Sequence, residues 1–149
     1  MSVRRVFVTA LVLALAVSLG ACSSRESPVR FEPNGGSLSG QGAERLAAST
    51  GVDSLAGVTT SDAPSRREAA LGTLRTAGPL GVRAADLLTT GFPARYPAVP
   101  VLVRACKVDG VDAIVVVEVF GDANGPLTHR RLWVFDRSTG NVTRAASFR

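Results

Sequence analysis

Apolar positions follow a helical period before residue 100 and a strand period after it. Before residue 100, a single helical face is apolar, and a stop signal, Gly78-Pro79, comes directly after it. The residues of this face are Ala70, Leu71, Leu74 and Ala77. The pattern predicts a helix over about residues 64–77, with Ser65 and Glu68 at capping-box spacing near its start. A second, shorter helix is expected over about residues 82–89.

After residue 100, four short segments are rich in β-branched and aromatic residues and are separated by turn signals. These segments, 101–108, 111–120, 130–137 and 142–148, are predicted strands. The pair Asp109-Gly110 between the first two predicts a tight hairpin, and Gly140 supplies the positive φ of a bulged turn before the last. The second segment is apolar on nearly both faces, so we expect a central strand. Residues 91–100 contain three prolines, and we expect no regular structure there.

The sequence therefore predicts an α+β fold, with one or two N-terminal helices packed on a four-stranded antiparallel meander sheet. We place this domain at residues 61–149. Its expected core residues are Val115, Val117, Trp133 and Phe135. The stretch from Asp136 to Val142 reads D-x-x-T-G-x-V and resembles the closing hairpin of PepSY-type domains and of many other secreted β-hairpins. The outline of a helix followed by a meander is similar to PepSY-like and cystatin-like domains.

The N-terminal residues have the three regions of a secretory signal. Arg4 and Arg5 precede an apolar run from Val6 to Leu19, and small residues follow it. At about 1.5 Å per residue this run spans roughly 21 Å as a helix, which is shorter than a hydrocarbon core of ~30 Å. A cleaved signal peptide at residues 1–21 is therefore expected rather than a membrane-spanning helix.

The four residues Leu19-Gly20-Ala21-Cys22 resemble the lipobox of bacterial lipoproteins. The resemblance implies cleavage between Ala21 and Cys22, lipid on Cys22 and a location at the outer face of the cell membrane. Residues 22–60 are then expected to form a lipidated flexible tether, with a possible short helix from Ala43 to Thr50. The alternative is an ordinary secretory signal in which Cys22 has no special role.

Composition narrows the choice of partners. The full chain carries 17 basic and 12 acidic residues, and the expected cleavage leaves 15 basic residues and a net charge of +3. Lys107 is the one lysine among them, and this arginine bias resembles that of high-GC actinobacterial proteins. An exported chain without a basic helix or a basic patch interleaved with aromatic residues does not favour nucleic acid as a partner. With Cys22 acylated, Cys106 has no intramolecular partner, and its place in an apolar strand predicts a buried, inert thiol.

Candidate chemistry is sparse. His129 is the one histidine, and a small hydrolase would have to combine it with Glu118 or Asp136. Asp109 and Asp112 are further carboxylates, but none forms a recognisable catalytic spacing. The stretch Asp122–Gly125 departs from the spacing of a calcium loop and predicts a turn. The doublets Arg66-Arg67 and Arg130-Arg131 are expected to be solvated.

These observations favour a non-catalytic binding or interaction module of the cell envelope, with an envelope protein or a wall component as its partner. No catalytic residue, metal or cofactor is assigned, and the oligomeric state is not predicted. A secreted-protease inhibitor or regulator, suggested by the helix-plus-meander outline, is one alternative. A small hydrolase is the other.

Replacement of the expected lipid site, Cys22→Ser, should release the chain from the membrane fraction, because one lipidated residue provides the proposed anchor. Fractionation followed by immunoblotting measures this. A variant that remains in the membrane fraction would show that the chain is held there by something other than lipid on Cys22.

Overall fold

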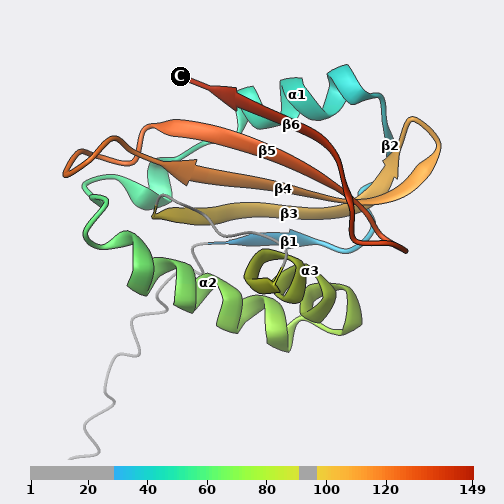
Figure 1. The fold of residues 1–149 in the computed structure, drawn as a ribbon, viewed down its shortest axis with the longest axis horizontal. Helices are drawn as coiled ribbons and strands as arrows, with labels where there is room; N and C mark the ends of the chain where they lie inside the picture. Colours follow the sequence, from blue (N-terminus) through green and yellow to red (C-terminus); the bar gives the residue numbers. More distant parts are fainter. Residues whose placement is uncertain (1–28, 91–96) are drawn as a thin grey trace, which may run out of the picture.

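The computed structural model describes residues 29–90 and 97–149. The expected signal peptide, Cys22 and residues 91–96 of the proline-rich loop lie outside the described residues. Within them, no helix is both long enough and apolar enough to cross a membrane. The fold is α+β, with helices on both faces of one mixed sheet (Figure 1).

Four long strands form the predicted antiparallel meander. They are β3 (Ala98–Val108), β4 (Val111–Phe120), β5 (His129–Asp136) and β6 (Val142–Phe148). The turn between β3 and β4 has φ of 50° at Asp109 and 85° at Gly110, as a tight hairpin with two left-handed residues requires. Gly140 has φ of 78°, and the register shifts between Val134 and Phe135, which confirms the bulged turn before β6.

Two short strands extend the meander on its β3 side. They are β1 (Arg30–Glu32) and β2 (Ser37–Leu38), and both run parallel to β3. The strand order is β1-β3-β4-β5-β6, with β2 also paired to β3. The expected four-stranded antiparallel sheet is therefore a mixed sheet with an added parallel edge, and β1 and β6 lie at its opposite edges.

The helices are divided between the two faces of the sheet (Figure 1). Helix α1 (Gly40–Ser49) and the short 3-10 helix η1 (Asp53–Leu55) belong to one face, whereas α2 (Ala63–Thr76) and α3 (Pro79–Thr90) cover the other. The predicted helices at 64–77 and 82–89 are confirmed as α2 and α3. The short helix expected near residues 43–50 is present as α1, but it is packed on the sheet.

Residues 29–60 differ from the expected flexible tether. They form β1, β2, α1 and η1, and Ala43 and Ala47 of α1 are completely buried. Composition alone does not predict this segment. A parallel edge strand of three residues has no local pattern, and the buried side chains of α1 belong to small alanines rather than to large apolar residues. The folded domain thus includes residues 29–60 and does not begin near residue 61.

Two local predictions also need correction. Helix α2 begins at Ala63, so Ser65 lies inside its first turn and donates to the carbonyl of Asp62, while Glu68 pairs with Arg75. The expected capping box is absent. Strand β3 begins at Ala98, so the predicted irregular loop ends three residues earlier than expected.

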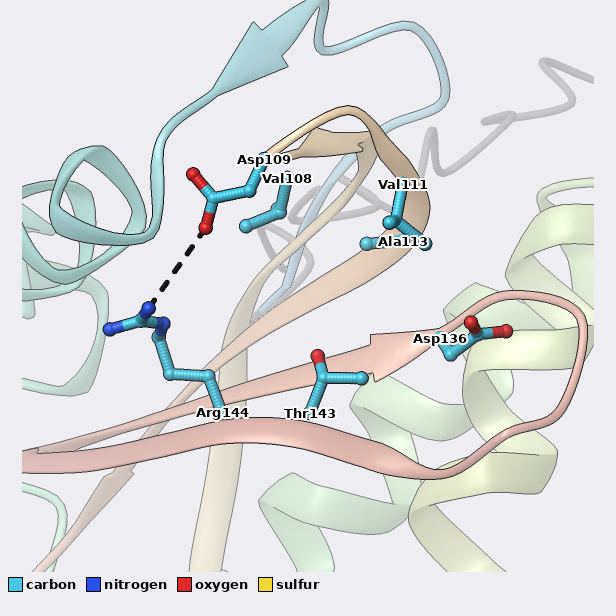
Figure 2. A pocket seen from close by; sticks show the side chains of 7 residues that line it. All are labelled: Val108, Asp109, Val111, Ala113, Asp136, Thr143 and Arg144. Carbon is cyan, nitrogen blue, oxygen red and sulfur yellow. Dashed lines mark ion pairs between the residues drawn. The ribbon is translucent and has the colours of Figure 1, made fainter.

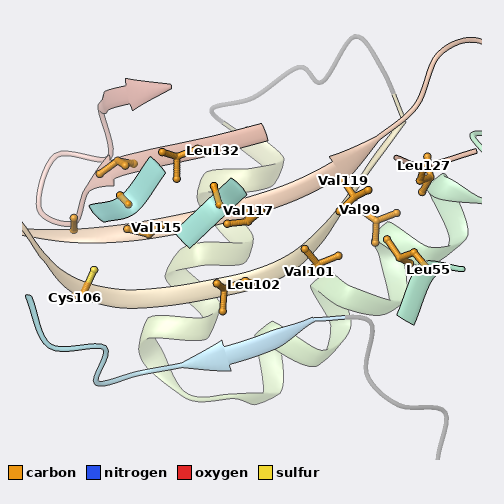
Figure 3. Close-up of a cluster of buried hydrophobic side chains, with 14 of the residues drawn as sticks. Leu55, Val99, Val101, Leu102, Cys106, Val115, Val117, Val119, Leu127 and Leu132 are labelled. Carbon is orange, nitrogen blue, oxygen red and sulfur yellow. The ribbon is translucent and has the colours of Figure 1, made fainter. Parts of the chain in front are cut away.

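The core is divided by the sheet into two clusters. The α1 side contains Val115 and Val117 together with Leu102 and Leu132, as Figure 3 shows. The α2 and α3 side is formed by Leu74, Leu88, Ile114, Val116 and Phe135 among others. The prediction that β4 is central and apolar on both faces is confirmed, since its residues from Ala113 to Val119 are all buried.

A buried polar network interrupts the core beneath α2. The Glu118 side chain is fully buried, and its Oε1 accepts a hydrogen bond from Nη1 of Arg67. Its Oε2 accepts from Nε1 of Trp133 at 2.9 Å, so both carboxylate oxygens are satisfied. Arg67 also donates to the carbonyl oxygens of Ala98 and Leu88 at 2.9 Å each. One side chain of α2 therefore ties together α3, β3 and β4.

This network corrects two expectations. Arg67 is largely buried rather than solvated, although its neighbour Arg66 is exposed. Trp133 is only partly buried, and its indole serves as a hydrogen-bond donor as well as a packing surface. Val115, Val117 and Phe135 are confirmed as core residues.

Replacing the buried carboxylate, Glu118→Gln, should lower the free energy of unfolding by about 3–5 kcal/mol, because it leaves the Arg67 charge buried without its counter-ion. The matched control is Glu68→Gln, whose partner Arg75 is exposed and whose loss should cost less than about 0.5 kcal/mol. Urea unfolding of both variants provides the comparison. Equal, small losses would show that the buried pair does not stabilise the fold.

Candidate functional site

A pocket lies on the α1 side of the sheet, where the β3–β4 hairpin approaches the start of β6. Its volume is about 260 Å³. The lining residues, shown in Figure 2, are Val108, Asp109, Val111, Ala113, Asp136, Thr143 and Arg144. Val108 and Ala113 are buried, whereas Val111 is 52% exposed. The pocket thus combines an apolar floor with a rim of two carboxylates, a hydroxyl and a guanidinium.

Asp109 is held rigidly at one side of the pocket. Both of its carboxylate oxygens accept from the backbone amide of Gly40, the first residue of α1, at 3.0 and 3.1 Å. Its own amide donates to the carbonyl of Leu38 in β2 at 2.9 Å. The negative charge at the start of α1 is favourable because the helix dipole places positive potential there. Asp109 therefore joins the hairpin to both β2 and α1.

Arg144 lies opposite Asp109 and connects β6 to α1. Its Nη1 is 2.8 Å from Oε1 of Glu44, and its Nη2 is 3.9 Å from Oδ2 of Asp109 (Figure 2). A Cβ atom at Gly40 would come within 2.3 Å of Arg144 Nη2, so glycine at this position makes room for the guanidinium. Arg144 was not among the residues predicted from the sequence. The sequence does contain a signal for Arg144. It faces the same side of the predicted last strand as Ala146 and Phe148, which pack on the core, and a charge on such a face indicates a partner.

Asp136 completes the rim from the end of β5. Its Oδ1 accepts from the hydroxyl of Ser138 at 2.6 Å and from the amides of Ser138 and Thr139 at 2.8 Å each. The Ser138 hydroxyl and the Thr139 amide lower the pKa of Asp136 from 3.8 to about 2, so the carboxyl is ionised at neutral pH. These three hydrogen bonds all end on Oδ1, and the Thr139 side chain contributes further to the lowered pKa.

The arrangement suits a cationic group attached to an apolar stem. The two carboxylates outnumber the guanidinium, and Arg144 is already paired with Glu44 and Asp109. The volume is below the roughly 300–1,000 Å³ of drug-sized ligand pockets, which fits a single side chain of a larger partner. No group here is placed to act as a nucleophile with an adjacent base.

The candidate hydrolase residues do not come together. His129 pairs with Phe120 at one end of β5, and Asp136 lies seven residues along the strand, roughly 23 Å away. Glu118 faces the same side of the sheet as His129, but it is fully buried and both of its oxygens bind Arg67 and Trp133. The acidic neighbour of His129 is instead Asp122, 3.4 Å from Nε2, and the Nδ1 atom of His129 is buried without a hydrogen bond. The geometry disfavours both proposed pairings.

The remaining candidates have structural roles. Asp112 bonds to Lys107 and Arg137 at 2.9 and 2.8 Å, and the Lys107 bond is the main cause of its lowered pKa. Arg130 donates to the carbonyl of Thr50 at 2.7 Å, whereas Arg131 lies over the rings of Phe120 and Trp133. The two arginines point to opposite faces of the sheet, and neither is simply solvated.

Two further sequence predictions are confirmed. The stretch from Asp122 to Gly125 is a turn, closed by a 2.9 Å bond from the Gly125 amide to the Asp122 carbonyl. Cys106 is buried, and burial raises the pKa of its thiol above 9.0. In the described part of the chain, no group of three or more His, Cys, Asp or Glu side chains is close enough to hold a metal ion.

The two roles of Asp109 can be separated by substitution. Asp109→Asn should lower the free energy of unfolding by about 0.5–1 kcal/mol, because the helix loses a charge but asparagine tolerates positive φ. Asp109→Ala should cost about 1–3 kcal/mol, because it adds backbone strain to the loss of the hydrogen bonds from the Gly40 amide. Thermal or urea unfolding of both variants measures the difference. An alanine variant as stable as the asparagine variant would argue against strain at this turn.

The lowered pKa of Asp136 predicts a pH dependence. Because its folded-state pKa of about 2 lies below the ordinary 3.8, the ionised carboxylate stabilises the fold above about pH 4, and this contribution is lost as the pH falls towards 2. Asp136→Asn retains the Oδ1 acceptor but cannot titrate. Its unfolding midpoint should therefore fall less than that of the native chain between pH 4 and pH 2. Parallel pH profiles would contradict the assignment.

Comparison of the chain with protein-family models, curated proteins and solved structures gives no match.

Proposed function

We propose that this chain is a non-catalytic binding module, anchored by lipid on Cys22 at the outer face of the cell membrane. Its partner is an envelope protein or a wall component that presents a cationic group to the pocket between the β3–β4 hairpin, α1 and β6. The observation that carries the proposal is the composition of this pocket, an apolar floor bounded by Asp109, Asp136 and Arg144.

Pre-organisation supports a binding role. Asp109 is fixed by Gly40 and Leu38, and Asp136 is fixed by the turn that follows it. A partner would therefore meet carboxylates that need no reordering, which reduces the entropy cost of binding. The exposed side chain of Val111 at the mouth of the pocket offers apolar contact beside these charges.

The alternatives have weaker support. A hydrolase based on His129 would need Glu118 or Asp136 as its partner. Glu118 is bonded to Arg67 and Trp133, and Asp136 lies at the other end of β5 from His129. A protease inhibitor was suggested by the helix-plus-meander outline, which is a likeness of fold and does not identify a function. We therefore retain the binding module as the proposed function.

The proposal predicts a partner contact at Val111. A photo-crosslinking residue placed there in the full-length chain should capture a discrete envelope component in living cells. The matched control is Val82 on α3, which is 40% exposed but lies on the opposite side of the sheet. Adding a short lysine-rich peptide in excess should reduce the crosslink from position 111, since the peptide competes for the carboxylates.

Immunoblotting and mass spectrometry identify the crosslinked species. The same products from positions 111 and 82, or none from position 111, would contradict the proposed use of the pocket. Hydrolysis of a substrate by the purified chain, lost on replacement of His129, would contradict the non-catalytic assignment.

A further inference from the structure

The first described residues of the domain lie very close in sequence to the expected lipid site. Val29 is buried, with 4% of its surface exposed, and it belongs to the core under α2 and α3. Arg30 follows at once as the first residue of β1, paired with Leu102 of β3. In the sequence, six residues separate Val29 from Cys22. A fully extended chain of that length reaches at most roughly 25 Å.

The attachment point lies at one edge of the sheet. We call residues 29–36 the β1 edge, because they run alongside β3 and β1 ends the strand order on that side. The opposite edge is β6, four strands away, which at about 4.8 Å per strand is roughly 19 Å. The membrane link therefore leaves the domain from a defined edge.

The two walls of the proposed binding pocket lie at different places relative to this attachment point. Asp109 lies seven residues along β3 from Leu102, the partner of Arg30, which corresponds to roughly 23 Å. Arg144 lies on β6, at the far edge of the sheet. Asp109 itself is bonded to β2 on the β1 side of the sheet, so the Arg144 wall is the part of the pocket farthest from the attachment edge.

Charge at the β1 edge favours contact with headgroup phosphates. The Arg30 side chain is 64% exposed, and Arg104 is the second arginine at this edge. Glu32 is the one acidic residue here and pairs with both arginines, through Oε1 and Oε2 respectively. The edge thus carries one net positive charge and an exposed guanidinium next to the membrane link.

We infer that the β1 edge lies against the headgroup layer of the membrane that holds Cys22, and that the β6 edge, which carries Arg144, is turned away from that membrane. This inference rests on the proposed lipid anchor. The Arg144 wall of the pocket would then be open to partners in the space outside the membrane.

Energy transfer from the anchored chain to labelled lipid tests this placement. The mature lipoprotein, carrying Cys106→Ala, is reconstituted into phosphatidylcholine–phosphatidylglycerol vesicles that contain a headgroup acceptor dye. A donor is attached at Asn34→Cys on the β1 edge or at Asn141→Cys in the turn before β6, both of which replace exposed residues. A third form has a Gly/Ser insert of about twenty residues between Ser24 and Arg25.

Transfer from position 34 should exceed that from position 141 by about twofold or more, and the insert should remove most of the difference, since it lets the domain turn freely. Equal transfer from both positions, or stronger transfer from position 141, would overturn the inference. If the difference in transfer persists after the insertion, the short link does not cause the orientation. In that case a surface of the domain would hold it against the membrane. Unfolding curves verify that each variant is folded.

Failure of this inference differs from failure of the proposed function. A mature chain without a lipid mass on Cys22 would overturn the anchor and this placement together. Crosslinks from Val111 would still establish use of the pocket in that case. Conversely, a correctly placed domain without crosslinks from Val111 would retain the orientation and remove the pocket as a binding site.

Discussion

The fold depends on the buried interaction between Arg67 and Glu118. Removing two charges from water is costly, and the cost is offset only if each charge has its counter-ion and hydrogen bonds. Glu118 has both, from Arg67 and Trp133, while Arg67 also binds the carbonyls of Ala98 and Leu88. The pair therefore fixes α2 against the sheet in one register, since sliding the helix by one turn would leave a buried charge without a partner.

The rest of the domain packs on the two faces of the sheet to which α2 is fixed. Helix α3 closes the same face with Leu87 and Leu88, and β4 supports apolar packing on both of its sides. The other face is covered by α1, whose start is bound by Asp109 of the hairpin. The same contact that caps α1 forms one wall of the pocket. The geometry of the pocket thus depends on how α1 is attached to the sheet.

The sequence predicted elements with local patterns. The periodicity of Ala70, Leu71 and Leu74, together with Asp109-Gly110 and Gly140, was enough for α2 and the meander. The edge strand β1 could not be predicted in this way, because three residues in a parallel pair leave no periodic trace. Arg67 could have been recognised, since it lies on the apolar stripe of α2 between Ala63 and Ala70, and a charge on such a stripe indicates a buried partner.

The pocket itself was not predictable from spacing. Asp109, Asp136 and Arg144 come from a hairpin, a strand end and an edge strand, and only the tertiary fold brings them around the same floor. Conversely, the candidate catalytic residues were chosen for their chemistry alone. The structure places His129 and Asp136 at opposite ends of β5, and it pairs Glu118 with Arg67 and Trp133. Glu118, the polar residue within the apolar run of β4, is paired with Arg67 inside the core.

The central claim is that this pocket receives a partner from the envelope. Hydrogen exchange of the membrane-anchored chain, with and without detergent extract of the producing cells' envelope, tests it most directly. The account predicts slower exchange of amides in residues 108–113 and 142–145 and unchanged exchange in α3. Unchanged exchange throughout, or protection confined to α2 and α3, would contradict it.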